Sequence, residues 1–397
     1  MAMFSSSKLP YLITLALYAG LPSRAVAQII PDGTLGPESS LLIDVSAVEQ
    51  LIQGGALREE NLFHSFEQFS IGEGGHVYFA HPANVERIFS RVTGDLPSDI
   101  FGTLGVNGGA DLYLLNPNGI VFGPNARLDV GGSFVVSTAN SFAFADGSEF
   151  SAVAPETSLL TIDVPLGVQF NTPTQGNIDS FGQLAAGQDL TLQGQELYLE
   201  GGLSAGRNLN LQAQETITIR DTAAVPLVAR SGGDLTIQGN QGIDIWTLQH
   251  LEQAPFVSGG NLTLISDGVI SGDAHFESGG NLQFLTFAGA PGNLVSFYDP
   301  IISANGDVVF GDYTGVALKV EATGSIAAGD IVITGPDTTL VADGSGSDED
   351  LLASSRAAIL RAGVALENGA NVPQVVNGTT FARSEERRVG KECRSRW

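Results

Sequence analysis

Between Gly187 and Thr334 the chain repeats one short pattern of hydrophobic and polar positions. Each copy has a glycine-containing turn, then Asp or Asn, then an apolar–polar–apolar run that reads as a short strand. A repeat of about 20 to 50 residues indicates a solenoid or a propeller, and one strand pair per repeat is too little for a propeller blade. We therefore predict an all-β fold, a parallel β-helix. The first apolar residues of the runs, spaced by 19, 26, 27, 20, 26 and 23 residues, are predicted to stack in one column: Leu190, Leu209, Leu235, Leu262, Leu282, Val308 and Ile331.

The alternation also predicts which side chains form the core. Residues two apart, such as Leu190 and Leu192, point to the same face of a strand. They are expected to point inward and to pack on the equivalent residues of the neighbouring coils. Glycine and asparagine are expected to take the positive φ angles of the corners. The unequal spacing predicts corner loops of different length, and only Asp350–Arg361 has a helical pattern.

The two ends of the chain differ from this body. Residues 1–27 read as a signal peptide, with Lys8, an apolar run from Leu9 to Leu21, and a small-residue site before Gln28. That run is shorter than the roughly 20 apolar residues that a membrane-spanning helix needs. We predict an exported, soluble chain with no stable membrane insertion.

Residues 384–397 carry five basic and three acidic residues and hold the only cysteine, Cys393. We interpret this segment as an assembly or reading-frame artefact, with a genuine basic tail as the alternative. Upstream of it, Lys319 is the only lysine after the signal peptide.

Charge and cysteine content exclude several classes of function. The net charge of −25 becomes about −27 without the last segment, and so acidic a surface repels nucleic acids and anionic membranes. Without cysteine, the body cannot hold a zinc site with cysteine ligands or a cysteine nucleophile. The absence of disulfides also suits a chain that crosses a narrow pore unfolded.

Three ordered motifs carry a resemblance to a known family: QIIPDGTLGPESS at 28–40, NLFHSFEQFSI at 61–71, and DIFGTLGVNGGADLYLLNPNGIVFGPNARLDVGGSFVVSTA at 99–139. Residues 28–160 resemble the secretion domain of filamentous-haemagglutinin-like two-partner-secretion exoproteins, especially the cyanobacterial ones. The resemblance implies a right-handed parallel β-helix with an N-terminal cap. It also implies a partner, an outer-membrane β-barrel transporter with periplasmic POTRA domains, and folding outside the cell. No cofactor and no catalysis are implied.

Within these motifs, the candidate partner-binding residues are Asn61, Leu62, Phe63, His64, Phe66, Asn116, Pro117, Asn118, Gly119 and Ile120. Phe63, Phe66 and Phe69 are spaced by three, and they either cover the open end of the β-helix or are read by the transporter. Asn116–Gly119 has the composition of a turn. It either connects two strands buried on both faces or contacts the transporter directly.

Catalytic and metal motifs are weak. Gly202–Gly206 matches the G-x-S-x-G pattern but is followed by a strand instead of a helix, so we interpret it as a corner turn. His76 and His81 form no metal-binding pattern. The acidic stretch Asp343–Asp350 could attract Ca²⁺ but lacks the spacing of an EF-hand, which favours a solvated loop.

These observations predict a signal peptide at 1–27, a secretion domain at 28–160, a β-helical stalk at 161–383 and an artefactual tail at 384–397. The predicted function is a non-enzymatic exoprotein with a structural or adhesive role at the cell surface. The alternative is a secreted polysaccharide-degrading enzyme, because β-helices also carry such enzymes. Its candidate carboxylates are Asp267, Asp273, Asp299 and Asp312. A third possibility is a small binding module that uses only corner loops.

Overall fold

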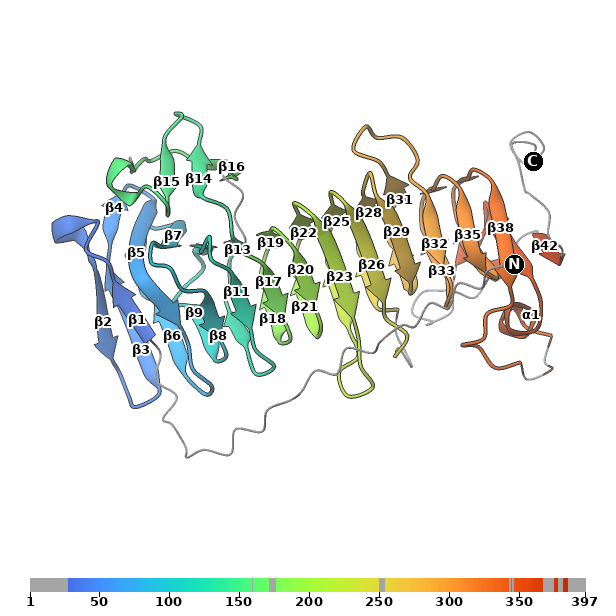
Figure 1. Ribbon diagram of the computed structural model, residues 1–397, viewed down its shortest axis with the longest axis horizontal. Coiled ribbons are helices and arrows are strands. Elements are labelled where there is room, and N and C mark those ends of the chain that lie inside the picture. Colours follow the sequence, from blue (N-terminus) through green and yellow to red (C-terminus); the bar gives the residue numbers. More distant parts are fainter. Residues whose placement is uncertain are drawn as a thin grey trace, which may run out of the picture.

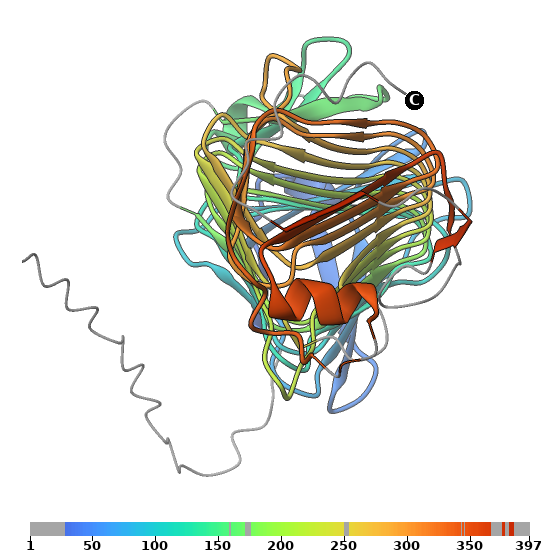
Figure 2. The same ribbon diagram turned by 90° about the vertical axis from the view of Figure 1, so that its right-hand side faces the viewer.

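The chain forms an elongated solenoid of short strands (Figure 1). Viewed along its axis, successive coils superpose around a single interior (Figure 2). This confirms the predicted all-β parallel β-helix. The expected signal peptide and residues 385–397 of the predicted tail lie outside the described residues. The computed structural model describes residues 28–158, 160–170, 176–249, 254–342, 344, 346–366, 375–377 and 381–384.

Within the described residues, the coil strands form three long sheets, visited in the order A, C, B. Sheet A contains β1 (Gln28–Pro31), β4 (Ala56–Arg58), β5 (Asn61–Ser70), β7 (Arg87–Val92), β10 (Asp111–Leu115), β13 (Phe134–Ser137), β19 (Leu190–Gly194), β22 (Leu209–Ala213), β25 (Leu235–Gly239), β28 (Leu262–Ile265), β31 (Leu282–Leu285), β34 (Val308–Val309) and β37 (Ile326–Ala327). Sheet C contains β8 (Ser98–Ile100), β11 (Ile120–Phe122), β17 (Ile178–Ser180), β20 (Leu197–Leu199), β23 (Thr216–Arg220), β26 (Gly242–Trp246), β29 (Val269–Asp273), β32 (Leu294–Ser296), β35 (Tyr313–Val316) and β38 (Ile331–Gly335). Sheet B contains β2 (Ser40–Asp44), β3 (Glu49–Gly54), β6 (His76–Phe79), β9 (Thr103–Val106), β12 (Arg127–Asp129), β18 (Gln183–Ala186), β21 (Gly202–Ala205), β24 (Val228–Ser231), β27 (Phe256–Ser258), β30 (His275–Ser278), β33 (Ile301–Ala304), β36 (Leu318–Ala322), β39 (Ala357–Ala362) and β42 (Phe381–Ser384).

Antiparallel strands close the N-terminal end of the solenoid, whereas the coils between are paired in parallel. Strand β1 runs antiparallel to β5, β4 also pairs with β5, and β2 pairs with β3. This is the N-terminal cap that the family resemblance implies, and it covers strand edges that would otherwise be free to associate. At the other end, β39 pairs antiparallel with β42, and β40 (Ala365–Leu366) pairs with β41 (Val375–Asn377).

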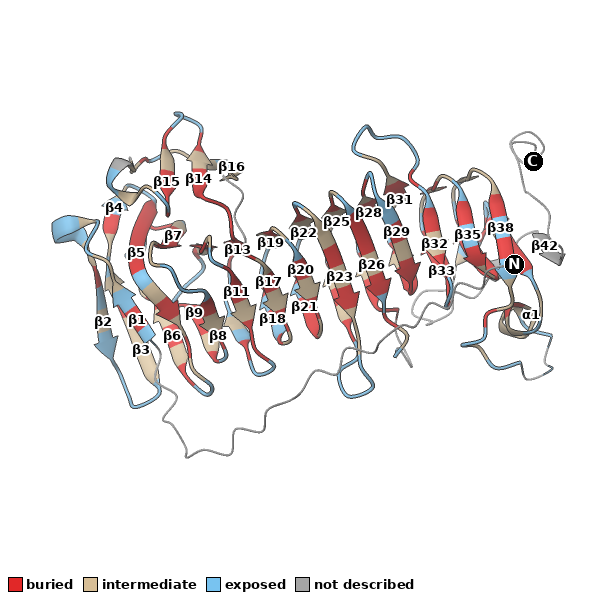
Figure 3. Cartoon of the chain, in the orientation of Figure 1, coloured by how far each residue is buried: buried red, intermediate tan, exposed pale blue. Residues whose placement is uncertain are grey.

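One column of apolar side chains runs through the described length of sheet A. Alternate residues of the strands are buried (Figure 3), and their side chains pack in one hydrophobic core. All members of the column are buried except Ile326, which is half-buried. The strand registers place in it Leu62, Ile88, Leu112, Phe134, Leu190, Leu209, Leu235, Leu262, Leu282, Val308 and Ile326.

The sequence-based column is therefore confirmed for six of its seven positions and wrong at the last. Ile331 lies in sheet C, where it pairs in register with Tyr313. The position after Val308 belongs to Ile326. The cause is that apolar–polar–apolar strands occur in all three sheets, so the local pattern alone does not name the sheet.

At the corners that precede the Asp or Asn of the repeat, glycine serves close approach and not positive φ, contrary to our expectation, whereas Gly201 at another corner has φ 87°. None of Gly206, Gly232 and Gly259 has a positive φ. A Cβ on each would lie 2.1 to 2.2 Å from the carbonyl oxygen of the corner glycine one coil earlier. No asparagine among the described residues has a positive φ either. The corners therefore require glycine because two backbones approach closely there.

The Asp and Asn residues after these glycines form a hydrogen-bond ladder between coils. In each case one side-chain oxygen accepts a bond from the backbone N–H of the equivalent residue in the next coil, at 2.7 to 3.0 Å. The ladder satisfies amides that the sheet leaves unpaired at the corner. It runs through Asp189, Asn208, Asp234, Asn261, Asn281, Asp307 and Ser325.

A three-stranded antiparallel sheet is inserted between β13 and β17, and it was not predicted from the sequence. It contains β14 (Ser141–Phe144), β15 (Glu149–Ser151) and β16 (Pro165–Gln169), in the order β15-β14-β16. We call it the outer sheet, because it lies outside the coils of β5, β7 and β10 (Figure 1). Position 160, the predicted domain boundary, falls between β15 and β16.

Helical structure in the described residues is limited to α1 (Asp348–Ser354) and two 3₁₀ turns, Gly36–Glu38 and Pro155–Thr157. The predicted helix at 350–361 is thus partly wrong, because residues 357–361 lie in strand β39. Ser347 caps α1 by accepting a bond from the N–H of Asp350, a common helix start. None of these helices has the length and apolar character needed to cross a membrane.

Candidate functional site

Strand β5, which carries the first candidate motif, is buried on both faces. Leu62 and Phe66 point into the solenoid core. Phe63 points outward and packs between the solenoid and the outer sheet, with its ring centroid 5.1 Å from that of Phe89 and 5.0 Å from that of Phe150. The outer sheet therefore explains why consecutive residues of this motif are all apolar or otherwise buried.

The spacing of the three phenylalanines reflects two different packing roles. Phe66 and Phe69 lie beneath the antiparallel strand β1, opposite Pro31 and Ile29. Phe66 and Phe69 therefore fit the alternative in which the phenylalanines cover the open end of the β-helix. Phe63 instead lies under the outer sheet.

His64 lies in the core between the cap and the first coils. Its Nδ1 is 2.9 Å from Oγ of Ser40, and its ring stacks on Phe66 and meets Phe79 edge-on. Complete burial lowers the pKa of His64 to about 3, because a charged imidazole loses its hydration there. The ring is therefore neutral wherever this fold is present at ordinary pH.

Asn61 joins the solenoid to the segment that leads into β16. Its Nδ2 donates to the carbonyl oxygens of Thr161 at 3.0 Å and Asp163 at 2.9 Å, and its Oδ1 accepts from Arg87 at 3.2 Å. All the hydrogen-bonding atoms of this buried amide side chain are thus used to position neighbouring backbone and a cation.

Arg91 is a buried arginine that the sequence analysis did not single out. It donates from Nε to Oγ of Ser65 at 2.8 Å, from Nη2 to Oγ1 of Thr34 at 3.0 Å, and from Nη1 to the carbonyl oxygen of Ser151 at 2.6 Å. Its guanidinium carbon lies 4.3 Å from the ring centroid of Phe150. Burial lowers the pKa of Arg91 to about 10, so it remains charged at neutral pH. One side chain therefore ties the cap, strand β5 and the outer sheet together.

Asp32 lies in the same polar cluster. Burial opposes its ionisation, but hydrogen bonds from Ser65, Thr93 and Thr34 lower its pKa. The Oδ2 atom of Asp32 accepts from Ser65 at 2.6 Å and from Thr93 at 2.7 Å. Asp32 comes from the first family motif, so this motif and strand β5 meet in one network.

The second candidate motif, Asn116–Ile120, forms a turn between β10 and β11. The Oδ1 atom of Asn116 accepts from the N–H of Asn118 at 3.0 Å, and its Nδ2 donates to the carbonyl oxygen of Leu96 at 3.0 Å. The N–H of Gly119 closes the turn on the carbonyl oxygen of Asn116, and Gly119 has φ 114°. The sequence-based prediction of a turn is confirmed.

The end of the first motif, at Phe66, and the turn of the second motif lie at the same corner of the solenoid, with one coil between them. The coil between them contributes Thr93 and Gly94. The N–H of Thr93 donates to the carbonyl oxygen of Phe66, and the carbonyl oxygen of Gly94 accepts from Nδ2 of Asn118 at 2.7 Å. Folding therefore couples the motifs through one intervening corner.

Most of the ten candidate residues are hidden in the folded chain. Eight are buried, Pro117 is half-buried, and only Asn118 is exposed. Their individual role in partner binding stays a prediction, but any partner that reads the seven buried side chains (Gly119 has none) must do so before the coils close.

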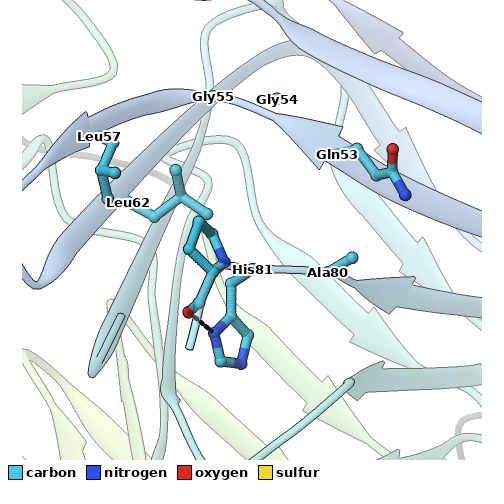
Figure 4. Close-up of a pocket in the computed structure, with 8 residues that line it drawn as sticks. Gln53, Gly54, Gly55, Leu57, Leu62, Ala80 and His81 are labelled. Carbon is cyan, nitrogen blue, oxygen red and sulfur yellow. Dashed lines mark hydrogen bonds between the residues drawn. The ribbon is translucent and has the colours of Figure 1, made fainter. Parts of the chain in front are cut away.

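A shallow depression of about 370 Å³ lies beside the first motif (Figure 4). Leu62 and His81 contribute to its wall, with Gly54 and Gly55 above them. Nδ1 of His81 is 2.8 Å from the carbonyl oxygen of Pro82. His76 begins strand β6 instead and does not line this depression.

Asp343 of the acidic stretch lies outside the described residues, and Asp348 of the same stretch contributes to a largely buried ionic cluster. Asp348 lies 2.8 Å from Nζ of Lys319 and also pairs with Arg361, which in turn binds Glu321 at 2.6 Å. Asp350 accepts from the N–H of Gly344 at 2.9 Å. These carboxylates are thus occupied by protein donors, and the described residues contain no group of three or more metal-ligating side chains.

The carboxylates considered for the enzyme alternative have structural partners. Asp267 accepts from the N–H of Phe287 at 2.9 Å, and Asp312 accepts from the N–H of Asp330 at 2.8 Å. Asp299 lies 2.7 Å from Nε2 of the buried His275. The Oδ1 atom of Asp273 accepts from two backbone amides.

The G-x-S-x-G segment is a strand, and our interpretation of it as a corner turn is wrong. Residues Gly202–Ala205 form β21 in sheet B, and the corner follows at Gly206. A serine within a strand does not have the strained turn of a nucleophile elbow.

Comparison with known proteins places this arrangement in a family. Residues 27–284 match the TPS secretion domain. The heme/hemopexin-binding protein of Haemophilus influenzae is 30% identical over 126 residues, which cover 32% of this chain and 13% of that protein. The chain therefore spans far less than two thirds of that relative.

Two solved structures are also similar. The filamentous hemagglutinin secretion domain aligns with a TM-score of 0.42 and 14% identity over 76% of this chain and 99% of that one. The HMW1 secretion domain from Haemophilus influenzae aligns with a TM-score of 0.39 and 14% identity over 78% and 89%. Because the TPS match covers more than half of its residues, the chain belongs to the TPS secretion-domain family and is an exoprotein of the two-partner-secretion type.

Proposed function

We propose that residues 28–160 direct export through a dedicated outer-membrane β-barrel transporter, whose periplasmic POTRA domains read the chain before it folds. Residues 161–383 begin a β-helical stalk with a structural or adhesive role at the cell surface. Family membership supports export across the outer membrane, and the transporter and the adhesive role are our proposal.

The observation that carries the proposal is the burial of the two candidate motifs. Asn61–Phe66 and most of Asn116–Ile120 are inaccessible once the coils have formed. Binding of these residues to a transporter and folding of the first coils are therefore mutually exclusive. Folding outside the cell would release the motifs from the transporter and prevent backward movement.

Burial of the stacked apolar residues favours movement of the chain out of the cell over movement back. Each new coil adds residues to the apolar column that begins at Leu62, at roughly 25 cal/mol for each Å² of apolar surface removed from water. No nucleotide is needed, because the free energy of folding on the outside favours outward movement. The capped N-terminal coils fold first and offer an edge on which the next coil pairs.

Export measurements test this proposal. The chain is expressed with and without a candidate two-partner-secretion transporter, and the amount in the medium is compared for the wild type, Asn116→Ala and Asn118→Ala. Asn261→Ala, a ladder asparagine far from the motifs, is the matched control. We expect export to require the transporter, with Asn116→Ala stalled in the periplasm and Asn261→Ala exported. Equal export without any transporter contradicts the proposal.

Asn118→Ala separates reading by the transporter from packing. Its side chain is exposed and its Nδ2 bonds only to backbone and to Asn116, so the purified variant is expected to keep most of its stability. Poor export of a stable variant indicates direct reading. An export defect that follows the loss of stability across variants indicates a folding role instead.

A further inference from the structure

A group of exposed aromatic side chains lies where the strands of sheet C end. Trp246 is 49% exposed, Phe297 is 47% exposed and Tyr298 is 38% exposed. Their strands, β26 and β32, are separated by β29 alone, and all three lie side by side in the solenoid (Figure 1). We call these three residues the aromatic platform.

Two of the three rings of the platform, those of Trp246 and Tyr298, stack on each other. The Trp246 and Tyr298 ring centroids are 5.8 Å apart and their planes differ by 10°. Both rings remain well exposed despite this contact. Trp246 is exposed on the outer face of parallel sheet C, in register between Arg220 and Asp273 of the neighbouring coils.

Buried polar groups hold the Phe297–Tyr298 corner rigidly. The Oδ1 atom of Asp273 accepts from the N–H of Phe297 at 2.7 Å, from the N–H of Tyr298 at 3.1 Å and from Oγ of Ser296 at 2.8 Å. Asp273 is itself buried. The backbone from which the Phe297 and Tyr298 rings project is therefore fixed by hydrogen bonds within the chain.

The residue after the platform is held in a sparsely populated conformation. Asp299 has φ 53°, its N–H donates to Oδ2 of Asp337 at 2.9 Å, and its carboxylate contacts His275. Such a conformation costs of order 1 kcal/mol or more in a non-glycine residue and persists when the surroundings impose it. Strain of this kind gathers at binding sites, because it fixes side chains in place before the ligand arrives.

Hydrogen-bonding groups flank the rings on the same face of the sheet. Thr218, Asp244 and Ser271 are in register on successive coils and lie two residues before the positions of Arg220, Trp246 and Asp273. Arg220 forms an ion pair with Asp244 and also donates from Nη1 to its carbonyl oxygen at 2.8 Å. Hydroxyl, carboxylate and guanidinium groups thus lie beside flat apolar surfaces.

We propose that the aromatic platform and this flanking polar column bind a neutral carbohydrate chain. A sugar ring has an apolar C–H face that suits an aromatic ring, and hydroxyl groups at its edge that suit paired polar side chains. The net charge of −25 disfavours anionic polysaccharides, which leaves neutral glycans as the ligand class. This inference rests on the proposed adhesive role, and it names neutral glycans as the ligand of that adhesion.

Binding is measured on the purified full chain by native gel electrophoresis through laminarin, xyloglucan, galactomannan or dextran, with hyaluronan as the anionic probe. We expect retardation in at least one neutral polysaccharide and none in hyaluronan. Trp246→Ala and Tyr298→Ala are each expected to weaken binding about tenfold or more, which corresponds to about 1.4 kcal/mol. The matched control is Phe287→Ala, an aromatic residue that is 43% exposed in the loop that leads into sheet C, at the opposite end of its strands.

A second readout does not depend on mobility. The chain has two tryptophans, so Trp397→Phe leaves Trp246 as the sole emitter, and the oligosaccharide of the retarding polymer should shift its emission. Three outcomes overturn the proposal: no retardation in any neutral probe, equal retardation of the wild type and Trp246→Ala, or retardation in hyaluronan alone. The proposal is also overturned if no polysaccharide retards the wild type but the wild type self-associates and Trp246→Ala does not. That result assigns the face to a second copy of the chain. No transporter is present in these assays, so their failure leaves the export proposal standing.

Discussion

The buried His64 makes a quantitative prediction about pH. Its neutral ring is enclosed by Ser40, Phe66 and Phe79, and burial lowers its pKa to about 3. In an unfolded chain the same imidazole has the ordinary pKa of about 6.5. Acidification should therefore destabilise the folded state through this one residue.

The sign and the size follow from proton linkage. Above pH 6.5 neither state holds a proton on His64, so the residue adds no pH dependence. Below pH 6.5 the unfolded state binds a proton that the folded state refuses, and the unfolding equilibrium constant rises about tenfold for each pH unit until pH approaches 3. Between pH 7.5 and 4.5 the expected effect is close to 100-fold, or about 3 kcal/mol of unfolding free energy.

Urea unfolding at pH 7.5 and at pH 4.5 measures this effect. His64→Gln keeps a polar group beside Ser40 but cannot be protonated. The wild type should therefore lose about 3 kcal/mol more than this variant between the two pH values. His76→Gln is the matched control, since His76 is only half-buried, and it should behave as the wild type does. Because the carboxylates are common to all three chains, their contribution cancels. If the wild type and His64→Gln lose stability in parallel, to within about 1 kcal/mol, the reasoning is refuted.

Three further predictions concern packing. Arg91→Met should lower the unfolding free energy by about 3–5 kcal/mol, because buried partners lose their donor, and should speed amide exchange in the outer sheet; unchanged exchange there would contradict the role of Arg91. Gly94→Ala places a Cβ 2.2 Å from a backbone oxygen and should cost about 1–3 kcal/mol, measured by urea unfolding. Gly109→Ala, where nothing lies within 4 Å, should be tolerated, and equal effects of the two alanines would argue against a steric cause. Asn261→Leu should cost about 1 kcal/mol in thermal unfolding by removing a ladder acceptor, whereas Asn261→Asp, which keeps the acceptor, should cost less.

The solenoid could be predicted from the sequence because each copy of the repeat carries the same short pattern of corner and strand residues. Leu190, Leu209 and Leu235 each follow a Gly-x-Asp or Gly-x-Asn corner, and the corner and the inward strand position go together in the structure. The prediction failed at Ile331, where the same local pattern occurs in another sheet. The three sheets differ in which strands pair between coils, and the sequence of a single repeat does not determine that pairing.

The outer sheet could not be predicted, because its strands differ from the coil strands only in what they contact. Phe142, Phe144 and Phe150 are buried against residues far away in the sequence. One signal was available: Arg91 is a lone cation in the otherwise apolar or small stretch Ile88–Val92, and a charge there needs partners from elsewhere. The outward face of β5 is likewise buried because the outer sheet covers it.

The start of helix α1 could be predicted from the sequence, but its end could not. The first turn of α1 has an N-cap serine and three acidic residues, which are favourable at a helix start. Its early end and the strand that follows depend on pairing of β39 with β36 and on the ion pairs of Asp348. Strand β36 and Lys319 lie about thirty residues before the helix in the sequence, outside any local pattern.

The uneven spacing of the repeats has a consequence for how such chains change over generations. Leu209, Leu235 and Leu262 keep one register although the corner loops between their coils differ in length. Extra residues at a corner add only a slowly growing loop-closure cost. Insertions there should be accepted by selection far more often than insertions in strands. The solenoid can therefore gain new surface loops one coil at a time, and the same corners are the natural places to graft a foreign peptide for display.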